Sequence, residues 1–296
     1  MADLDGRVQA VFGDGERGFR DGKAAEARFQ DPQGLWIEGG TLYVADTGNH
    51  SIRAIDLGAG TVRTVAGTGR QGRWGETSGK ATETSLNSPW DVLKDGNSLY
   101  VAMAGRHQIW RLDLASGEVG AWIGSGREDI ADGPAEESEL AQPSGLALAG
   151  GVLYIADSES SGVRAFDLAE KRLRTLVGTG LFDFGDAEGK GGKVLQHPLA
   201  VCVQGGDLII ADSYNHRLKR LDLKSGEVRF WLGTGKPGAE DGKAPAFFEP
   251  GGIALHAGKL YVADTNNHRV RVVDLATGVT SSLKLAARPA EAKPPK

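Results

Sequence analysis

The chain has 296 residues and a formal net charge of −5, which argues against nonspecific binding to nucleic acid or to an anionic membrane. Cys202 is its only cysteine, which excludes an intrachain disulfide, a CxxC redox pair and a cysteine-based zinc site. A single cysteine is typical of proteins in a reducing compartment, so we predict a cytoplasmic location. The sequence has no signal-peptide core and no run of 18 apolar residues, so no membrane span is predicted.

One sequence pattern occurs five times. It reads LYVADTGNHSIRAIDL from Leu42, and its copies begin 52 to 57 residues apart, at Leu99, Leu153, Leu208 and Leu260. A period of this length marks a repeat architecture in which a single unit cannot bury its apolar faces alone. The pattern predicts stacked units, with function on a surface that several units share.

Each unit contains four strand-like segments. In the first unit they are PQGLWI from Pro32, the LYVAD run, the IRAIDL run and VRTVAG from Val62. Short runs of Val, Ile, Leu, Tyr and Trp between Gly, Asp, Asn or Ser are typical of strands. The LYVA run is apolar on both faces, which suits a sheet covered on both sides, so we predict an all-β propeller of four-stranded blades.

The predicted propeller domain covers residues 1–285. The tail over 286–296 is rich in Pro, Ala and charge, so it is predicted to be disordered. One extra outer strand is predicted over 8–13, and the run 279–285 competes with it for the outer edge of the last blade. The five complete blades are predicted at about 32–67, 89–124, 143–178, 198–233 and 250–285.

Loops of about 20 residues join the fourth segment of each unit to the next unit, whereas the turns within a hairpin are tight. Alternate connections of an up-and-down sheet lie at opposite ends, so the long loops and the TGNH-type tetrads are predicted to share one face. We call this the long-loop face. Each long loop carries an apolar residue three positions before a proline, interpreted as a pin on the blade: Phe29, Leu86, Leu140, Leu195 and Phe247.

The ADTxNHxIRxxDL pattern resembles the NHL repeat, whose propellers belong to the six-bladed TolB-like family. Individual copies, such as SPWDV with AMAGRHQIW (88–92 and 102–110), resemble more specifically the NHL-repeat-containing protein 2 type, over about 8–285. Proteins of that type carry a thioredoxin-like domain before the propeller. This chain has neither that domain nor a CxxC, and the resemblance begins inside the first blade, at 3–8.

Three alternatives account for the missing strands of that blade. The five complete units close into a smaller ring, a partner chain fills the gap, or the chain is a fragment of a longer six-bladed protein. Two bared blade faces would forgo apolar burial on the order of 20 kcal/mol, more than a typical net stability of about 5–15 kcal/mol. We therefore expect no ring that stays open.

The residues before and after the fixed prolines are the first candidate site. By the family's propeller plan the first segment lies nearest the axis, so these residues would ring one mouth of the channel. Their carboxylates and imidazole could hold a cation, and other NHL-like propellers include metal-dependent lyases and lactonases. The candidate mouth residues are Asp31, Ser88, Trp90, Asp91, Gln142, His197 and Glu249.

An acidic loop is the second candidate site. The long loops hold 19 acidic and 12 basic residues, whereas RNA binding needs a basic face with stacking aromatics, so no nucleic-acid partner is predicted. The loop is either simply solvated or docks a basic protein segment. The loop aromatics Trp74, Phe182 and Phe184 are either pins or contact points. The acidic residues are Glu128, Asp129, Asp132, Glu136, Glu137 and Glu139.

Repeated polar residues are interpreted as structural. The tetrad histidines lie on different blades, and the Asp that ends each second segment can accept backbone hydrogen bonds, although Met103 replaces it once. Cys202 lies in the apolar run AVCVQ and is interpreted as an inert thiol. The tetrad histidines are His50, His107, His216 and His268. The aspartates that end the second segments are Asp46, Asp157, Asp212 and Asp264.

Repeats without a converging catalytic set predict a non-catalytic protein-interaction scaffold that binds through its long-loop face. We predict no catalytic residue, no metal and no cofactor. The resemblance implies a thioredoxin-like module, encoded elsewhere in the parent protein, beside the propeller. The alternative function is a metal-dependent hydrolase or lyase at the channel mouth, and a third is a ligand-sensing module with a pocket in the channel.

Overall fold

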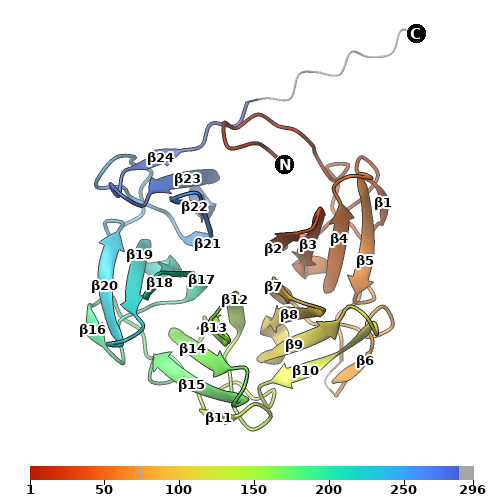
Figure 1. Cartoon of the computed structure of the whole chain (residues 1–296), viewed down its shortest axis with the longest axis horizontal. Helices are drawn as coiled ribbons and strands as arrows, with labels where there is room; N and C mark the ends of the chain where they lie inside the picture. The colour runs from red at the N-terminus through yellow and green to blue at the C-terminus, as the bar shows by residue number, and fades with distance from the viewer. Residues whose placement is uncertain (74, 287–296) are drawn as a thin grey trace.

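A computed structural model describes residues 1–73 and 75–286. These residues form five antiparallel sheets that surround a central axis as blades, so the predicted all-β propeller is confirmed (Figure 1). The predicted six-bladed architecture is wrong for this chain. Each complete repeat builds one sheet, and the residues before the first repeat build none, which leaves five blades.

The first four strands of every blade follow chain order from the axis to the rim. The innermost strands are β2 (Pro32–Glu38), β7 (Pro89–Asp95), β12 (Pro143–Ala149), β17 (Pro198–Gln204) and β21 (Pro250–His256). The second strands are β3 (Thr41–Asp46), β8 (Ser98–Met103), β13 (Val152–Asp157), β18 (Asp207–Asp212) and β22 (Lys259–Asp264). The third strands are β4 (Ser51–Asp56), β9 (Gln108–Asp113), β14 (Gly162–Asp167), β19 (Arg217–Asp222) and β23 (Arg269–Asp274). The fourth strands are β5 (Thr61–Ala66), β10 (Glu118–Ile123), β15 (Arg172–Val177), β20 (Glu227–Leu232) and β24 (Thr280–Ser282).

Four blades carry a fifth, outermost strand, which the sequence analysis did not predict. The long loop that precedes each blade supplies it, as where Gly22 pairs with Val62. Two or three residues are too short to give a periodic signal in the sequence. These strands are β1 (Gly22–Lys23), β6 (Ser78–Lys80), β11 (Gly133–Pro134) and β16 (Gly189–Lys190).

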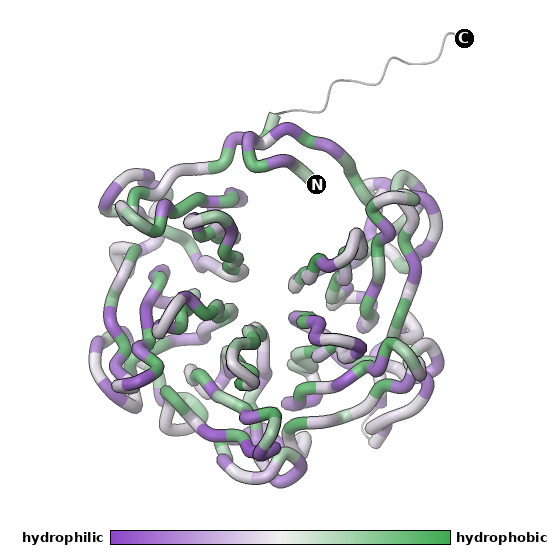
Figure 2. Tube along the Cα trace, in the orientation of Figure 1, coloured by the Kyte–Doolittle hydropathy of each residue, from purple (hydrophilic) through white to green (hydrophobic). Residues whose placement is uncertain are grey.

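The apolar core lies between blades rather than within one. Tyr43 and Ala45 of the first blade share a cluster with Val92 and Val101 of the second. Figure 2 shows the apolar stretches along the blade strands. Neighbouring blades thus cover both faces of the LYVA run, as its composition predicted. The loop pins are confirmed, because all but the half-buried Phe29 are completely buried: Leu86, Leu140, Leu195 and Phe247.

The packing of blade on blade does not run all the way round. Inner strands contact each other from β2 to β7, β12, β17 and β21 in turn, and the described residues show no comparable packing of β21 on β2. Figure 1 shows an opening at this place, with both ends of the described chain at its rim. The five units therefore do not close into a smaller ring.

The run 279–285 takes the outer edge of the fifth blade, since β24 within it pairs with β23. The extra strand predicted over 8–13 is not formed. Residue Arg7 makes only an isolated bridge, to Ala286 at the other end of the described chain. Apart from Ala286, the predicted disordered tail lies outside the described residues.

Candidate functional site

The Asp that ends the second strand holds the long loop of its own blade. Asp46 Oδ1 accepts the backbone N–H of Gln30 at 2.7 Å, and its Oδ2 accepts bonds from Arg53 at 2.7 Å and Asn49 at 2.8 Å. Asn49 also donates to the loop carbonyl of Gly18 at 2.8 Å. The interpretation of this Asp as structural is supported, although its backbone donor lies 16 residues away rather than in a local turn.

A buried cation completes each of these networks. Arg53 is fully buried and also contacts Asp21 of the long loop at 2.6 Å. Burial raises the pKa of Asp157 and of Asp212, and the cations Arg164 and Lys219 oppose that shift. In the second blade both partners change together, because Met103 replaces the Asp and Trp110 replaces the Arg, both fully buried. An apolar pair thus substitutes for the ion pair.

The tetrad histidines join one blade to the next. His50 Nδ1 accepts the N–H of Ser88 at 3.0 Å, and His216 Nδ1 accepts the N–H of Glu249 at 3.2 Å. In the third blade, a serine takes over this slot, and Ser161 Oγ accepts the N–H of His197 at 3.3 Å. Burial lowers the pKa of His50, which favours the neutral acceptor.

Every junction between two packed blades has a second such bond. In the second blade Ala104 has no hydroxyl for this bond, and in the third blade the hydroxyl of Ser158 donates to Gln142 O instead. An inner-strand side chain makes the bond in these two blades. The pairs are Thr47 Oγ1 with Pro89 O (2.6 Å), Asp91 Oδ2 with Leu146 N (2.8 Å), Ser144 Oγ with Pro198 O (3.2 Å) and Ser213 Oγ with Pro250 O (2.6 Å). Asp91, predicted as a mouth residue, is therefore part of a blade junction.

The environment of Asp91 is tight. A Cβ at Gly34 would lie 2.2 Å from Asp91 Oδ1, so only glycine fits on the neighbouring inner strand. Desolvation raises the pKa of Asp91 to about 7, against two backbone N–H donors, Leu146 and Val92, that favour the carboxylate. Trp90 beside it is half-buried.

The residues before the prolines share a left-handed backbone, with φ from 46° at His197 to 57° at Gln142. Their side chains bind locally. Asp31 pairs with Arg17 at 2.7 Å, and Glu249 accepts a bond from Asn266 at 2.8 Å. The half-buried Ser88 bonds to its own neighbour, Asn87.

The mouth residues do not converge on one point. His197 stacks on Tyr214 at 4.4 Å and contacts Glu159 of the preceding blade at 3.3 Å, while Gln142 lies 3.4 Å from Glu128. Within residues 1–73 and 75–286, no three His, Cys, Asp or Glu side chains come together as a metal site. The metal-dependent alternative thus has no supporting geometry in this part of the chain.

The acidic loop divides into held and free carboxylates. Asp132 bonds to Arg164 at 3.0 Å and Thr175 at 2.7 Å; burial raises its pKa, but these bonds bring it below the usual value. Glu139 has a largely buried side chain near Arg127. Glu128, near Gln142, is exposed. The other exposed carboxylates are Asp129, Glu136 and Glu137.

An exposed aromatic patch lies on the fourth blade. Phe182 and Phe184 are 80% and 51% exposed, so they are not buried pins. Tyr214, which sequence reasoning missed, is 49% exposed, and its signal was the tetrad SYNH in place of TGNH. Asn215 donates to Gly185 O at 2.7 Å and ties the loop to the tetrad. Trp74 lies outside the described residues.

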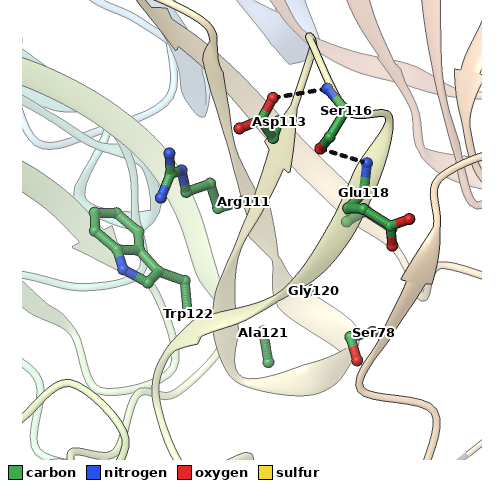
Figure 3. A pocket seen from close by; sticks show the side chains of 9 residues that line it. Ser78, Arg111, Asp113, Ser116, Glu118, Gly120, Ala121 and Trp122 are labelled. Atoms are coloured by element: carbon green, nitrogen blue, oxygen red, sulfur yellow. Dashed lines mark hydrogen bonds between the residues drawn. The ribbon is translucent and has the colours of Figure 1, made fainter.

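A hollow of about 400 Å³ lies elsewhere, against the outer strands of the second blade (Figure 3). Arg111, Asp113 and Trp122 line it, and Asp113 accepts the N–H of Ser116 at 3.0 Å. Trp122 stacks on Tyr100, with 4.8 Å between the ring centroids, so aromatic packing explains the position of Trp122. None of the mouth residues lines this hollow.

Residues 29–55, 195–221 and 247–273 match the model of the NHL repeat. Each segment runs from a loop pin through the tetrad, so the repeat spans the loop, the inner strand and the junction groups described above. The chain contains NHL repeats. In this NHL propeller, the Asn of the tetrad binds the blade's own loop, and the His binds the following blade.

Curated relatives of the NHL chain are considerably longer. It is 42% identical, over 93% of its length, to Protein SUPPRESSOR OF QUENCHING 1, chloroplastic, of Arabidopsis thaliana, and covers 28% of that protein. It is 39% identical, over 95% of its length, to human NHL repeat-containing protein 2, and covers 44% of that protein. The chain thus spans less than half the length of these relatives.

Solved structures agree on the fold alone. A protein of unknown function from Bacteroides thetaiotaomicron superposes with a TM-score of 0.67 at 17% identity, covering 93% of this chain and 63% of that one. A chain of the nidogen/laminin complex gives a TM-score of 0.60 at 15% identity, covering 88% and 81%. In the described part of the chain, no helix has the length and apolarity to cross a bilayer. The cytoplasmic location stays a prediction, since one relative is called chloroplastic.

Proposed function

We propose that this propeller is a non-catalytic protein-interaction scaffold that binds its partner through the long-loop face. The observation that carries the proposal is the aromatic patch on the fourth blade. Phe182, Phe184 and Tyr214 are all about half exposed or more, while the loops that bear them are held by buried networks. Exposed aromatics on an ordered support are typical of binding surfaces.

Acidic side chains on the long-loop face indicate the chemistry of the partner. The exposed carboxylates Asp129, Glu136 and Glu137 lie on the loop of the third blade, and Glu159 of that blade contacts His197 next to Tyr214. A basic segment with aromatic or aliphatic side chains would complement both features. A thioredoxin-like module is a further proposed partner, supported by the resemblance to the NHL-repeat-containing protein 2 type.

Affinity capture coupled to cross-linking mass spectrometry tests this surface. With the wild-type chain, we expect a set of partner proteins to be captured and cross-linked to the loops of the third and fourth blades. With F182S/F184S and with E136K/E137K, we expect these partner proteins to be lost. The matched control is E118K/E227K, which reverses two exposed charges at the opposite ends of the strands. A partner set that survives both loop variants would contradict the proposal.

A further inference from the structure

The hollow at the outer strands of the second blade lies where other blades carry an arginine. Gly120 of β10 pairs with Arg111 of β9, and both line the hollow. A Cβ at Gly120 would lie 2.9 Å from the Cβ of Ser78 on β6, so the close approach of this outer strand favours glycine. The residues in the slot of Gly120 in the first, third and fourth blades are Arg63, Arg174 and Arg229.

The fourth blade shows what the missing basic side chain does. Arg229 lies 3.6 Å from Asp222, the aspartate that ends the third strand of that blade. Asp113 is the matching aspartate of the second blade. Its Oδ1 accepts the turn N–H groups of Ala115 and Ser116, but no basic side chain of the described residues forms an ion pair with it. The carboxylate of Asp113 thus lacks the cation that its counterpart has.

Arg111 also lacks a partner that its counterpart has. Arg220, in the same slot of the fourth blade, contacts Asp207 at 3.1 Å. In the second blade Ser98 stands in place of Asp207, and Arg111 Nε donates to the hydroxyl of Ser98 at 2.8 Å. Within the described part of the chain, no carboxylate pairs with the exposed Arg111. Its guanidinium therefore keeps N–H donors for another partner.

The aromatic wall of the hollow is fixed by packing. Trp122 meets Phe166 of the third blade edge to face, with 5.1 Å between the ring centroids. Arg111 and Trp122 lie on the same side of Gly120, and Asp113 lies nearer the turn (Figure 3). The hollow thus presents one unpaired guanidinium and one unpaired carboxylate beside an ordered aromatic ring.

We propose that this hollow binds the C-terminal arginine or lysine of another protein. The basic side chain would take the place that Arg229 fills in the fourth blade and would pair with Asp113. The terminal carboxylate would pair with Arg111, as Asp207 pairs with Arg220. A C-terminal basic residue is the smallest piece of polypeptide that carries both charges. It suits a hollow of about 400 Å³, which is near the lower end of the range for ligand pockets.

The hollow lies beside the turn between β9 and β10, at the end of the strands away from the long loops. The inference therefore concerns a different surface from the long-loop face and does not depend on it. Free arginine is another source of the same two charges. Its α-ammonium group would add a like charge beside Arg111, whereas the nitrogen of a peptide terminus is a neutral amide.

The probe is the dipeptide acetyl-Gly-Arg with a free carboxylate, titrated into the full chain and followed by the indole N–H signal of Trp122 in NMR spectra. We expect saturable, millimolar binding, because exposed ion pairs contribute little each. The C-terminal amide of the dipeptide and its citrulline analogue each remove one charge at nearly the same shape. Each should bind about fivefold more weakly, and free arginine should also bind more weakly than the dipeptide.

Two variants test the assigned pairs. D113N keeps an oxygen for the turn N–H groups, and it should weaken binding of the dipeptide about fivefold, with little further loss for the citrulline analogue. S98D gives Arg111 a carboxylate of its own, so it should weaken binding of the dipeptide but not of its amide. The matched control is D222N, the same substitution in the fourth blade, where Arg229 fills the slot, and it should leave the affinity unchanged.

Four results would each overturn the proposal. The first is the absence of saturable binding to the wild-type chain. The second is equal binding of the dipeptide and either of its two uncharged analogues. The third is an equal loss of affinity in D222N and D113N. The fourth is tighter binding of free arginine than of the dipeptide, since that would make a free amino acid the ligand.

Discussion

His50 Nδ1 accepts the backbone N–H of Ser88 at 3.0 Å, so the histidine of one blade holds the residue that begins the next. The same bond recurs from His107 to Gln142, at 3.3 Å, and from His216 to Glu249. The histidine of the repeat is therefore a connector between blades. The histidine recurs because most blades must be joined to a following blade, and its recurrence does not indicate that the histidines share a metal.

The loss of stability caused by replacing this histidine should depend on whether a following blade is packed against it. H216A leaves the N–H of Glu249 without its acceptor, and we expect unfolding free energy to fall by about 1–2 kcal/mol. H268A removes a side chain to which no N–H of the described residues donates, and it should change stability by less than about 0.5 kcal/mol. Urea unfolding of both variants measures the difference, and equal losses would contradict the junction role.

The buried ion pairs should be replaceable only as pairs. D264M leaves Arg271 buried without the carboxylate it contacts at 2.7 Å, and we expect a loss of about 3–5 kcal/mol. D264M/R271W, which copies the apolar pair Met103 and Trp110 of the second blade, should lose less than D264M alone. Thermal and urea unfolding provide the comparison, and strictly additive losses would refute the pairing.

Asp91 should make stability depend on pH. Its folded-state pKa of about 7 lies above the ordinary 3.8, so between these values the folded chain holds a proton that the unfolded chain has released. Stability contributed by this group is therefore present at low pH and lost as pH rises from about 4 to about 7. D91N cannot ionise and should lack this part of the decline. Parallel Tm profiles for both proteins over that range would exclude the effect.

The same aliphatic slot should tolerate charge in one blade and not in another. L35D places its carboxylate in solvent at the opening and should shift stability by no more than about 0.5 kcal/mol. L146D buries a charge at a packed junction, where the residue is 7% exposed, and should cost more than about 3 kcal/mol. Circular dichroism and chemical denaturation check this, and a large loss in L35D would mean that the opening is closed in solution.

Cys202 should be an unreactive thiol while the chain is folded. Desolvation raises its pKa to about 12, so at pH 8 only about one thiol in ten thousand is ionised. A thiol-specific reagent at pH 8 should label the native chain slowly and the urea-unfolded chain rapidly. Rapid labelling of the native chain would show that the inner strand opens.

Much of the fold could be predicted because blade packing leaves a local signature. The proline that begins each inner strand, the doubly apolar LYVA run and the pins such as Leu195 are all visible one unit at a time. The candidate sites fared differently. The sequence predicted Asp91 at the channel mouth and Asp132 on an acidic loop. In the structure they contact Leu146 and Arg164, on strands that only folding brings near.

Of the three alternatives for the missing strands, the structure excludes one, the closure of the five units into a smaller ring. Among the described residues of the inner strands, the large aliphatic side chains that are more than half exposed are Leu35 and Ile37, and the fifth blade has the small residues Gly252 and Ala263 at the opening. Less apolar area is left uncovered than a count of typical core side chains suggests.

Repetition along the chain determined by itself that this protein is an all-β propeller, since short doubly apolar strands at a constant period can be buried only by their own neighbours. Tertiary structure alone decided how many blades stand in the ring, where the ring stays open and which carboxylates are already paired. The physical reason is distance: these outcomes rest on contacts between groups tens of residues apart, whose partners no local pattern records.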